Sequence, residues 1–182
     1  EWVAEAKKRG LPNIKTGVEA LHYMATPEAV KLFEKYKVLS KGELHARHEI
    51  YLEHYVKHIN IEARAAVQMV KRQYLPAVFE FTKDLARTVS KLKSVAVSSK
   101  VQKELLEKVN ELLESANAKL AAVEESIEKA HAVKDLEKRA DAFRDKVVVA
   151  VSELRKDIDA LEGLLPANLW PVPTYAEMLF KL

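Results

Sequence analysis

Four histidines and two glutamates within one short stretch are the residues best suited to chemistry in this chain. They are His45, His48, His54 and His58, with Glu49 and Glu53 between them. His54 and His58 are four residues apart, so on a helix both imidazoles project from one face and could bind a divalent metal. The zinc-protease pattern needs Glu directly after the first His, but Tyr55 stands there, and no third ligand is evident. We therefore expect no physiological metal site, and His54 and His58 are the candidates should one exist.

Other reaction chemistries find little support in the residue types. The 182-residue chain has no Cys, which excludes thiol catalysis, disulfides and cysteine-based zinc sites. Its four glycines are scattered, and none precedes the Lys-Ser or Lys-Thr pair of a phosphate-binding loop. The carboxylates of Glu124, Glu125, Glu128, Asp157 and Asp159 lie in highly charged stretches, which favours a solvated helix face. We expect no catalytic and no cofactor-binding residue within this chain.

Composition and charge are typical of a helical protein that binds neither nucleic acid nor membrane. With 48% hydrophobic and 31% charged residues and only 4 Gly, the chain is unlike disordered or loop-rich β proteins. The net charge of +3 and the short basic clusters are too mild for a nucleic-acid groove. No apolar run approaches the roughly 18 residues of a membrane span. Without Cys or a secretory signal, a reducing, cytoplasmic location is the expectation.

One long periodic stretch dominates the predicted secondary structure. Ser40 and Glu43 form a capping box, in which each side chain satisfies a backbone amide of the other residue. Apolar residues then recur every three or four positions and predict a helix over 41–95. Pro76 lacks an amide hydrogen and crowds the preceding turn, so we expect a bend or break there. Upstream, Thr26 followed by Pro27 predicts the start of a shorter helix.

Two further helices are predicted to form a hairpin. Ser99 and Gln102 form a second capping box, and apolar residues then repeat every seven positions, as in a coiled coil. After a break around 131–134, a second helix is predicted to end near 162, with a step from Leu154 to Ile158 that leaves the heptad register. The expected arrangement is an antiparallel pair, 99–131 against 135–162, whose seam forms the chain's own core.

The resulting fold prediction is all-α: a long-helix bundle with an antiparallel coiled-coil-like hairpin and an extended, Pro-rich C-terminal tail. We divide one domain into an irregular N-terminal segment (1–17), short helices plus the long Pro76-bent helix (18–97), the hairpin (98–165) and the tail with a last short helix (166–182). Prolines bias the residues before them toward extended backbone, so 169–175 (LWPVPTY) is predicted to be extended. Thr174 would cap a final helix over 175–180.

Several short motifs carry a resemblance to a known family. They are 11–16 (LPNIKT), 33–36 (FEKY), 49–53 (EIYLE), 60–63 (NIEA), 71–73 (KRQ), 75–77 (LPA) and 169–175 (LWPVPTY). Together they resemble the C-terminal region of type III glutamine synthetases, the large bacterial form with a helical extension after its catalytic domain. The resemblance runs from about Leu11 to the end and is most specific at 60–63, Arg72-Gln73 and 170–175.

The resemblance implies a parent enzyme rather than an active site in this chain. The parent would be an ATP-dependent glutamate–ammonia ligase that forms glutamine through a γ-glutamyl phosphate, with Mg or Mn, in a large homo-oligomer. The family's metal, nucleotide and ammonium sites belong to its catalytic domain, so no catalytic residue transfers onto these positions. Because the chain begins with Glu rather than Met, we expect it to be a fragment of that larger enzyme. The resemblance leaves the histidine-rich stretch unexplained.

Two interpretations of the tail and two other functions remain open at this point. Trp170, Pro171, Pro173 and Tyr175 are the candidate interaction residues, docking either on the parent's catalytic domain and neighbouring subunits or only on the bundle's own core. An independent helical adaptor that binds another protein is the alternative function. A metal-binding helical protein using His54 and His58 is the third.

Overall fold

The chain folds into helices, as the periodic patterns predict. The computed structural model describes residues 1–173 and 175–179, and only the backbone of residues 175 and 176. Within these residues every regular element is helical and no strand occurs, so the all-α prediction is confirmed. None of the helices in the described part is long and apolar enough to cross a membrane.

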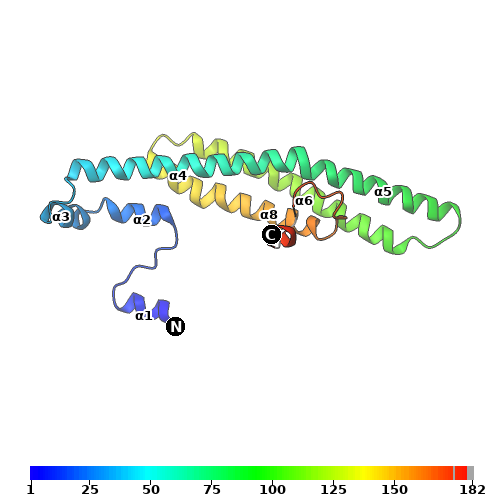
Figure 1. Cartoon of the computed structure of the whole chain (residues 1–182), viewed down its shortest axis with the longest axis horizontal. Helices are drawn as coiled ribbons and strands as arrows, with labels where there is room; N and C mark the ends of the chain where they lie inside the picture. The colour runs from blue at the N-terminus through cyan, green and yellow to red at the C-terminus, as the bar shows by residue number, and fades with distance from the viewer. Residues whose placement is uncertain (174, 180–182) are drawn as a thin grey trace.

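Three short helices precede the long ones. They are α1 (Trp2–Lys8), α2 (Gly17–Met24) and α3 (Pro27–Lys35). The prediction that 1–17 is irregular is therefore wrong over α1. That helix is only seven residues long, too short for an apolar pattern to repeat. It buries no residue, and Figure 1 shows it away from the long helices. Thr16 and Glu19 form a capping box that begins α2, and Thr26 caps α3 with Pro27 in its first turn, as expected.

The predicted long helix is continuous through Pro76. It comprises α4 (Lys41–Met69), one π-helical turn η1 (Val70–Tyr74) and α5 (Leu75–Ser94). The Ser40–Glu43 capping box is confirmed: the Ser40 amide donates to the Glu43 carboxylate at 2.8 Å, and Ser40 Oγ accepts from the Glu43 amide at 3.3 Å. Proline removes a backbone donor and crowds the carbonyl four residues earlier. The irregularity accordingly lies in the turn before Pro76, where the wider π turn inserts one extra residue without ending the helix.

After α5 the chain reverses direction twice, so that two further segments pack along the long helix. The returning elements are α6 (Lys100–His131), α7 (Leu136–Ala142), the π turn η2 (Phe143–Val147) and α8 (Val148–Glu162). The break predicted around 131–134 is confirmed, with Asp135 capping α7. The Ser99–Gln102 capping box does not form. Ser99 has a ψ of 26° instead of an extended backbone, and its side chain makes no cap hydrogen bond.

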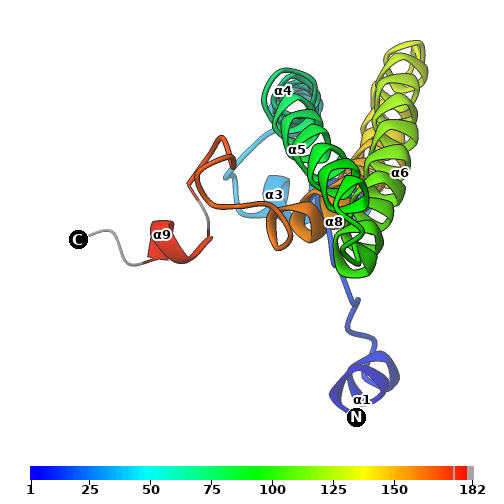
Figure 2. The ribbon, with the colours of Figure 1, turned by 90° about the vertical axis from the view of Figure 1, so that its right-hand side faces the viewer.

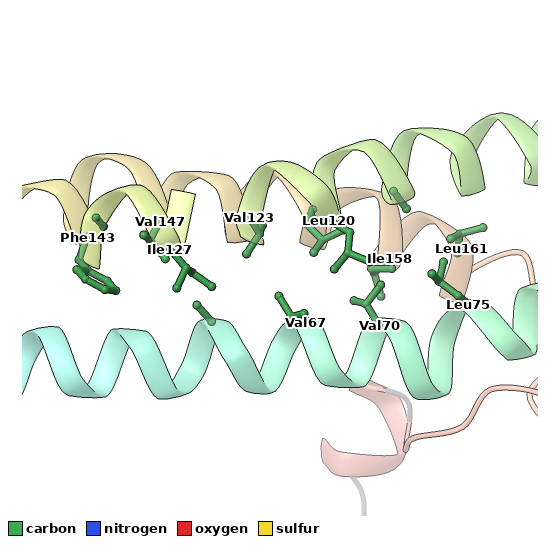
Figure 3. Close-up of a cluster of buried hydrophobic side chains, with 14 of the residues drawn as sticks. Val67, Val70, Leu75, Leu120, Val123, Ile127, Phe143, Val147, Ile158 and Leu161 are labelled. Atoms are coloured by element: carbon green, nitrogen blue, oxygen red, sulfur yellow. The ribbon is translucent and has the colours of Figure 1, made fainter. Parts of the chain in front are cut away.

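The core lies where three long segments meet: α4 to α5, α6, and α7 to α8. Helix α6 contacts α5 as well as α8, so the predicted hairpin is part of a three-segment bundle instead of a separate pair (Figures 1 and 2). Figure 3 shows side chains from α4, α6 and the η2–α8 segment pointing into one shared interior. Its fully buried members include Val123, Phe143, Val147 and Leu161. Both π turns contribute to it, through Val70 and through Phe143 and Val147.

One carboxylate expected on a solvated face is instead buried between two helices. Asp157 of α8 is 8% exposed, and its two oxygens accept from Ser115 Oγ at 2.6 Å and Lys119 Nζ at 2.7 Å, both on α6. A nearly buried charge needs such partners. This pairing connects α6 to α8 at a defined register.

After α8 the chain turns back on the bundle. The amide groups of Leu169 and Trp170 donate to the Pro166 carbonyl at 2.9 and 3.2 Å. A short helix, α9 (Tyr175–Leu179), follows, and Figure 2 shows it to one side of the long helices. Thr174 and Phe180, the predicted cap and end of this helix, lie outside the described residues.

Candidate functional site

The candidate interaction residues of the tail have different environments. Trp170 is 7% exposed, and its ring stacks on Tyr74 with 4.9 Å between centroids and 16° between planes. Trp170 thus belongs to the bundle's own core, while Pro171 and Pro173 beside it are exposed. The side chain of Tyr175 lies outside the described residues. Docking of this tail on another protein surface stays a prediction, and the two exposed prolines are the residues available for it.

The two histidines named from their spacing do lie together, on the outside of α4. The rings of His54 and His58 are 4.2 Å apart between centroids, and both residues are exposed. In the part of the chain that the structure describes, neither belongs to a group of three possible metal ligands.

A different set of titratable side chains converges where α2, α4 and α7 meet. His48 of α4, His22 of α2 and Glu137 of α7 each offer one ligand-type atom, and these atoms all lie within 4.8 Å of one another. His48 Nε2 is 3.9 Å from Glu137 Oε1, and the rings of His22 and His48 are 6.5 Å apart between centroids. His22 Nε2 also lies 3.2 Å from Asp141 Oδ1.

The sequence contained a signal for His48 but none for its partners. His48 lies four residues from Leu44 and from Leu52, both fully buried, so helical periodicity places it on the inner face of α4. Grouping it with the exposed pair His54 and His58 missed this distinction. His22 is 26 positions upstream of His48, and Glu137 is 89 positions downstream of it. No local spacing could relate them.

Burial determines the protonation of His48. The residue is 3% exposed, and its Nε2 has no hydrogen-bond partner, since 3.9 Å to Glu137 is too long for one. Desolvation lowers the pKa of His48 below its ordinary value of 6.5. The charges of His22 and His45 lower it further, whereas the carboxylates of Glu137 and Glu49 oppose the shift.

We predict that the metal-free chain loses stability as the pH falls below about 6.5. The unfolded chain then takes up a proton that folded His48 resists, so protonation favours the unfolded state; above that pH the stability is fully present. Urea denaturation in EDTA at several pH values between 5 and 8 measures this dependence. His48→Leu should flatten the profile, and the same change at exposed His58 should leave it unaltered. Equal flattening by both variants would contradict the assignment to His48.

Comparisons with known proteins agree on one family. The family model of the glutamine synthetase C-terminal domain matches residues 1–93, which span α1 to α5. A glutamine synthetase of Butyrivibrio fibrisolvens is 32% identical over 184 residues, covering all of this chain and 26% of that protein. A type-3 glutamine synthetase of Dictyostelium discoideum is 35% identical over 190 residues, covering 99% of the chain and 25% of that protein.

A third relative extends the same match. The glutamine synthetase of Bacteroides fragilis is 25% identical over 186 residues, with 99% of this chain and 26% of that protein covered. The chain thus spans about a quarter of the length of the curated relatives it matches. The similarity continues through α6 to α8, beyond the residues that the family model covers. This chain belongs to the glutamine synthetase C-terminal domain family.

Proposed function

We propose that this chain is the C-terminal helical part of a longer type III glutamine synthetase that forms glutamine from glutamate and ammonia with ATP. In this proposal the segment is non-catalytic and supports the structure of a cytoplasmic homo-oligomer. The observation that carries it is the end-to-end match to glutamine synthetases in which a segment of this length makes up only a quarter of the protein.

The glycines of this chain do not form a phosphate-binding loop. A phosphate-binding loop brings glycine backbone close to the ligand. Here a Cβ added at Gly10, Gly17 or Gly42 would meet no atom within 4 Å, so none of these glycines lines a tight cradle. The fourth, Gly163, lies just after the end of α8. In this proposal, ATP and the Mg or Mn ions of the reaction bind to the parent's catalytic domain.

The outer face of α4 supports an assembly role. Ile50 and Ile61 lie on the same face of α4, because eleven positions correspond to about three turns. This face is roughly opposite the buried residues of the helix. Both side chains are largely exposed. Exposed branched apolar side chains at such positions are suited to contact the parent's catalytic domain or a neighbouring subunit. The exposed prolines Pro171 and Pro173 offer a second, rigid contact.

The test uses the intact gene product. We expect a product several hundred residues longer than this chain, with glutamine formation that depends on ATP and ammonia. In that protein, Ile50→Glu with Ile61→Glu should shift the oligomer to smaller species in analytical ultracentrifugation, because two charges would be buried at the contact. Val101→Glu, at an exposed valine on α6, is the matched control and should leave the oligomer intact.

Two results would count against the proposal. A native product of about this chain's length would favour the independent helical adaptor. If the oligomer keeps its size in the variant with both isoleucine substitutions, the outer face of α4 is not an assembly surface.

A further inference from the structure

We propose that His22, His48 and Glu137 form a binding site for a divalent transition-metal ion of the Zn²⁺ type, which joins α2 to α4 and α7. The site uses none of the residues singled out for metal binding from sequence. It is independent of the proposed ligase function, since it concerns only residues of this chain.

The three side chains are close to the spacing that zinc requires. Zn²⁺ binds imidazole nitrogen and carboxylate oxygen at about 2.0–2.2 Å in tetrahedral geometry, so its ligand atoms lie about 3.3–3.5 Å from one another. His48 Nε2 and Glu137 Oε1 are 3.9 Å apart, and the whole set lies within 4.8 Å. Glu137 and His22 are partly exposed, so their side chains can rotate to shorten these distances. The required contraction is at most about 1.5 Å, which is within the reach of a side-chain rotation.

His48 is the independent observation that points to a ligand. Its Nε2 is buried and has no hydrogen-bond partner in the described structure. Leaving such a polar atom unsatisfied costs free energy, and a metal ion would provide the missing partner. Metal ligation requires the neutral imidazole, and burial favours that form by lowering the pKa of His48.

Neighbouring charges complete the arrangement around His22. Asp141 lies 3.2 Å from His22 Nε2 and is itself paired with Arg144 at 3.1 Å. With Nε2 directed at Asp141, His22 would ligate the metal through Nδ1. A carboxylate that accepts from the second ring nitrogen of a ligating histidine is the common outer-shell partner of zinc sites, where it orients the ring. With two imidazoles and one carboxylate as ligands, the site favours Zn²⁺ over Mg²⁺ or Ca²⁺, which prefer oxygen ligands. A water molecule would fill the fourth position.

The location of the ligands indicates what binding would do. His22 lies in the last turn of α2, His48 in the second turn of the long helix, and Glu137 in the first turn of α7. One ion would therefore connect three elements that are distant in sequence. Because the unfolded chain does not hold these groups together, ion binding should raise the stability of the folded chain and fix α2 against the bundle.

Calorimetric titration of Zn²⁺ into the metal-free 182-residue chain tests the proposal. We expect one site whose binding persists in a large excess of Mg²⁺, with a midpoint of thermal unfolding that rises with Zn²⁺ concentration. Co²⁺ in place of Zn²⁺ should give the visible absorption of a tetrahedral nitrogen–oxygen site. His22→Gln and Glu137→Gln should each weaken binding by at least the roughly 10–100-fold that removal of an outer-shell partner costs, and Asp141→Asn should weaken it by about that amount.

The control separates this site from the surface histidines. His54→Gln with His58→Gln removes the exposed pair and should leave the Zn²⁺ affinity unchanged. His48 itself is kept intact in these variants because it is a core residue, so its replacement would change the stability of the chain together with metal binding. Absence of Zn²⁺ binding would overturn the proposal. So would binding that is lost in the His54/His58 variant but retained in the His22 and Glu137 variants.

Discussion

Replacing Phe143 by Ala is expected to lower the free energy of unfolding by about 3–5 kcal/mol. Phe143 is completely buried in η2, and Figure 3 shows its ring pointing into the interior between α4 and α6. Its ring also makes an edge contact with His131 at the end of α6, with 5.2 Å between centroids. The alanine variant would lose the buried apolar surface of the ring and leave a cavity that the surrounding helices fill only partly.

Phe79→Ala is the matched control for this prediction. It makes the same chemical change on α5, where the phenylalanine is 55% exposed, so the free energy of unfolding should change by no more than about 0.5 kcal/mol. Urea denaturation followed by circular dichroism measures both variants. Comparable losses at the two positions would show that Phe143 does not have the core position described above.

The elements that the sequence predicted well are those specified by neighbouring residues. The Ser40–Glu43 capping box and the Thr26–Pro27 helix start need only a few adjacent side chains, and both form. The long periodic stretches likewise form helices because their apolar faces are buried in the bundle. Helix α1 has neither cap nor buried face, and its formation could not be anticipated from periodicity.

The elements that were missed depend on packing between distant segments. The π turns η1 and η2 each insert one residue so that side chains on both sides of the turn face the core. Neither has a sequence pattern of its own, although Pro76 gave a hint for η1. Asp157 is similar, since its burial depends on Ser115 and Lys119 of another helix.

The group formed by His22, His48 and Glu137 likewise could not be predicted from sequence spacing alone. Spacing along one helix correctly brought His54 and His58 together. The more enclosed group needs His22 and Glu137 from two other helices, and only the fold relates these to His48. For the tail, the proline pattern indicated a rigid segment, but Tyr74 as the partner of Trp170 could not be read from sequence.

Trp170→Ala is expected to lower the free energy of unfolding by about 3 kcal/mol, the lower end of the range for a buried Trp. Two opposing effects determine this value. The ring is 7% exposed and stacks on Tyr74, which favours a large loss. Its Nε1 donor, however, is buried without a hydrogen-bond partner among the described residues, and removing an unsatisfied donor relieves part of the cost.

A second variant at the same position distinguishes these two effects. Trp170→Phe keeps an aromatic ring on Tyr74 but removes the unsatisfied donor, so its loss should be clearly smaller than that of the alanine variant. Trp2→Ala is the control, because Trp2 is 63% exposed and should contribute little. In a Trp2→Phe background, Trp170 is the single tryptophan, and its fluorescence should report unfolding at the same urea concentration as circular dichroism. Earlier loss of that fluorescence would mean that the tail detaches separately from the bundle, and Trp170 would then be free to dock elsewhere in the parent protein.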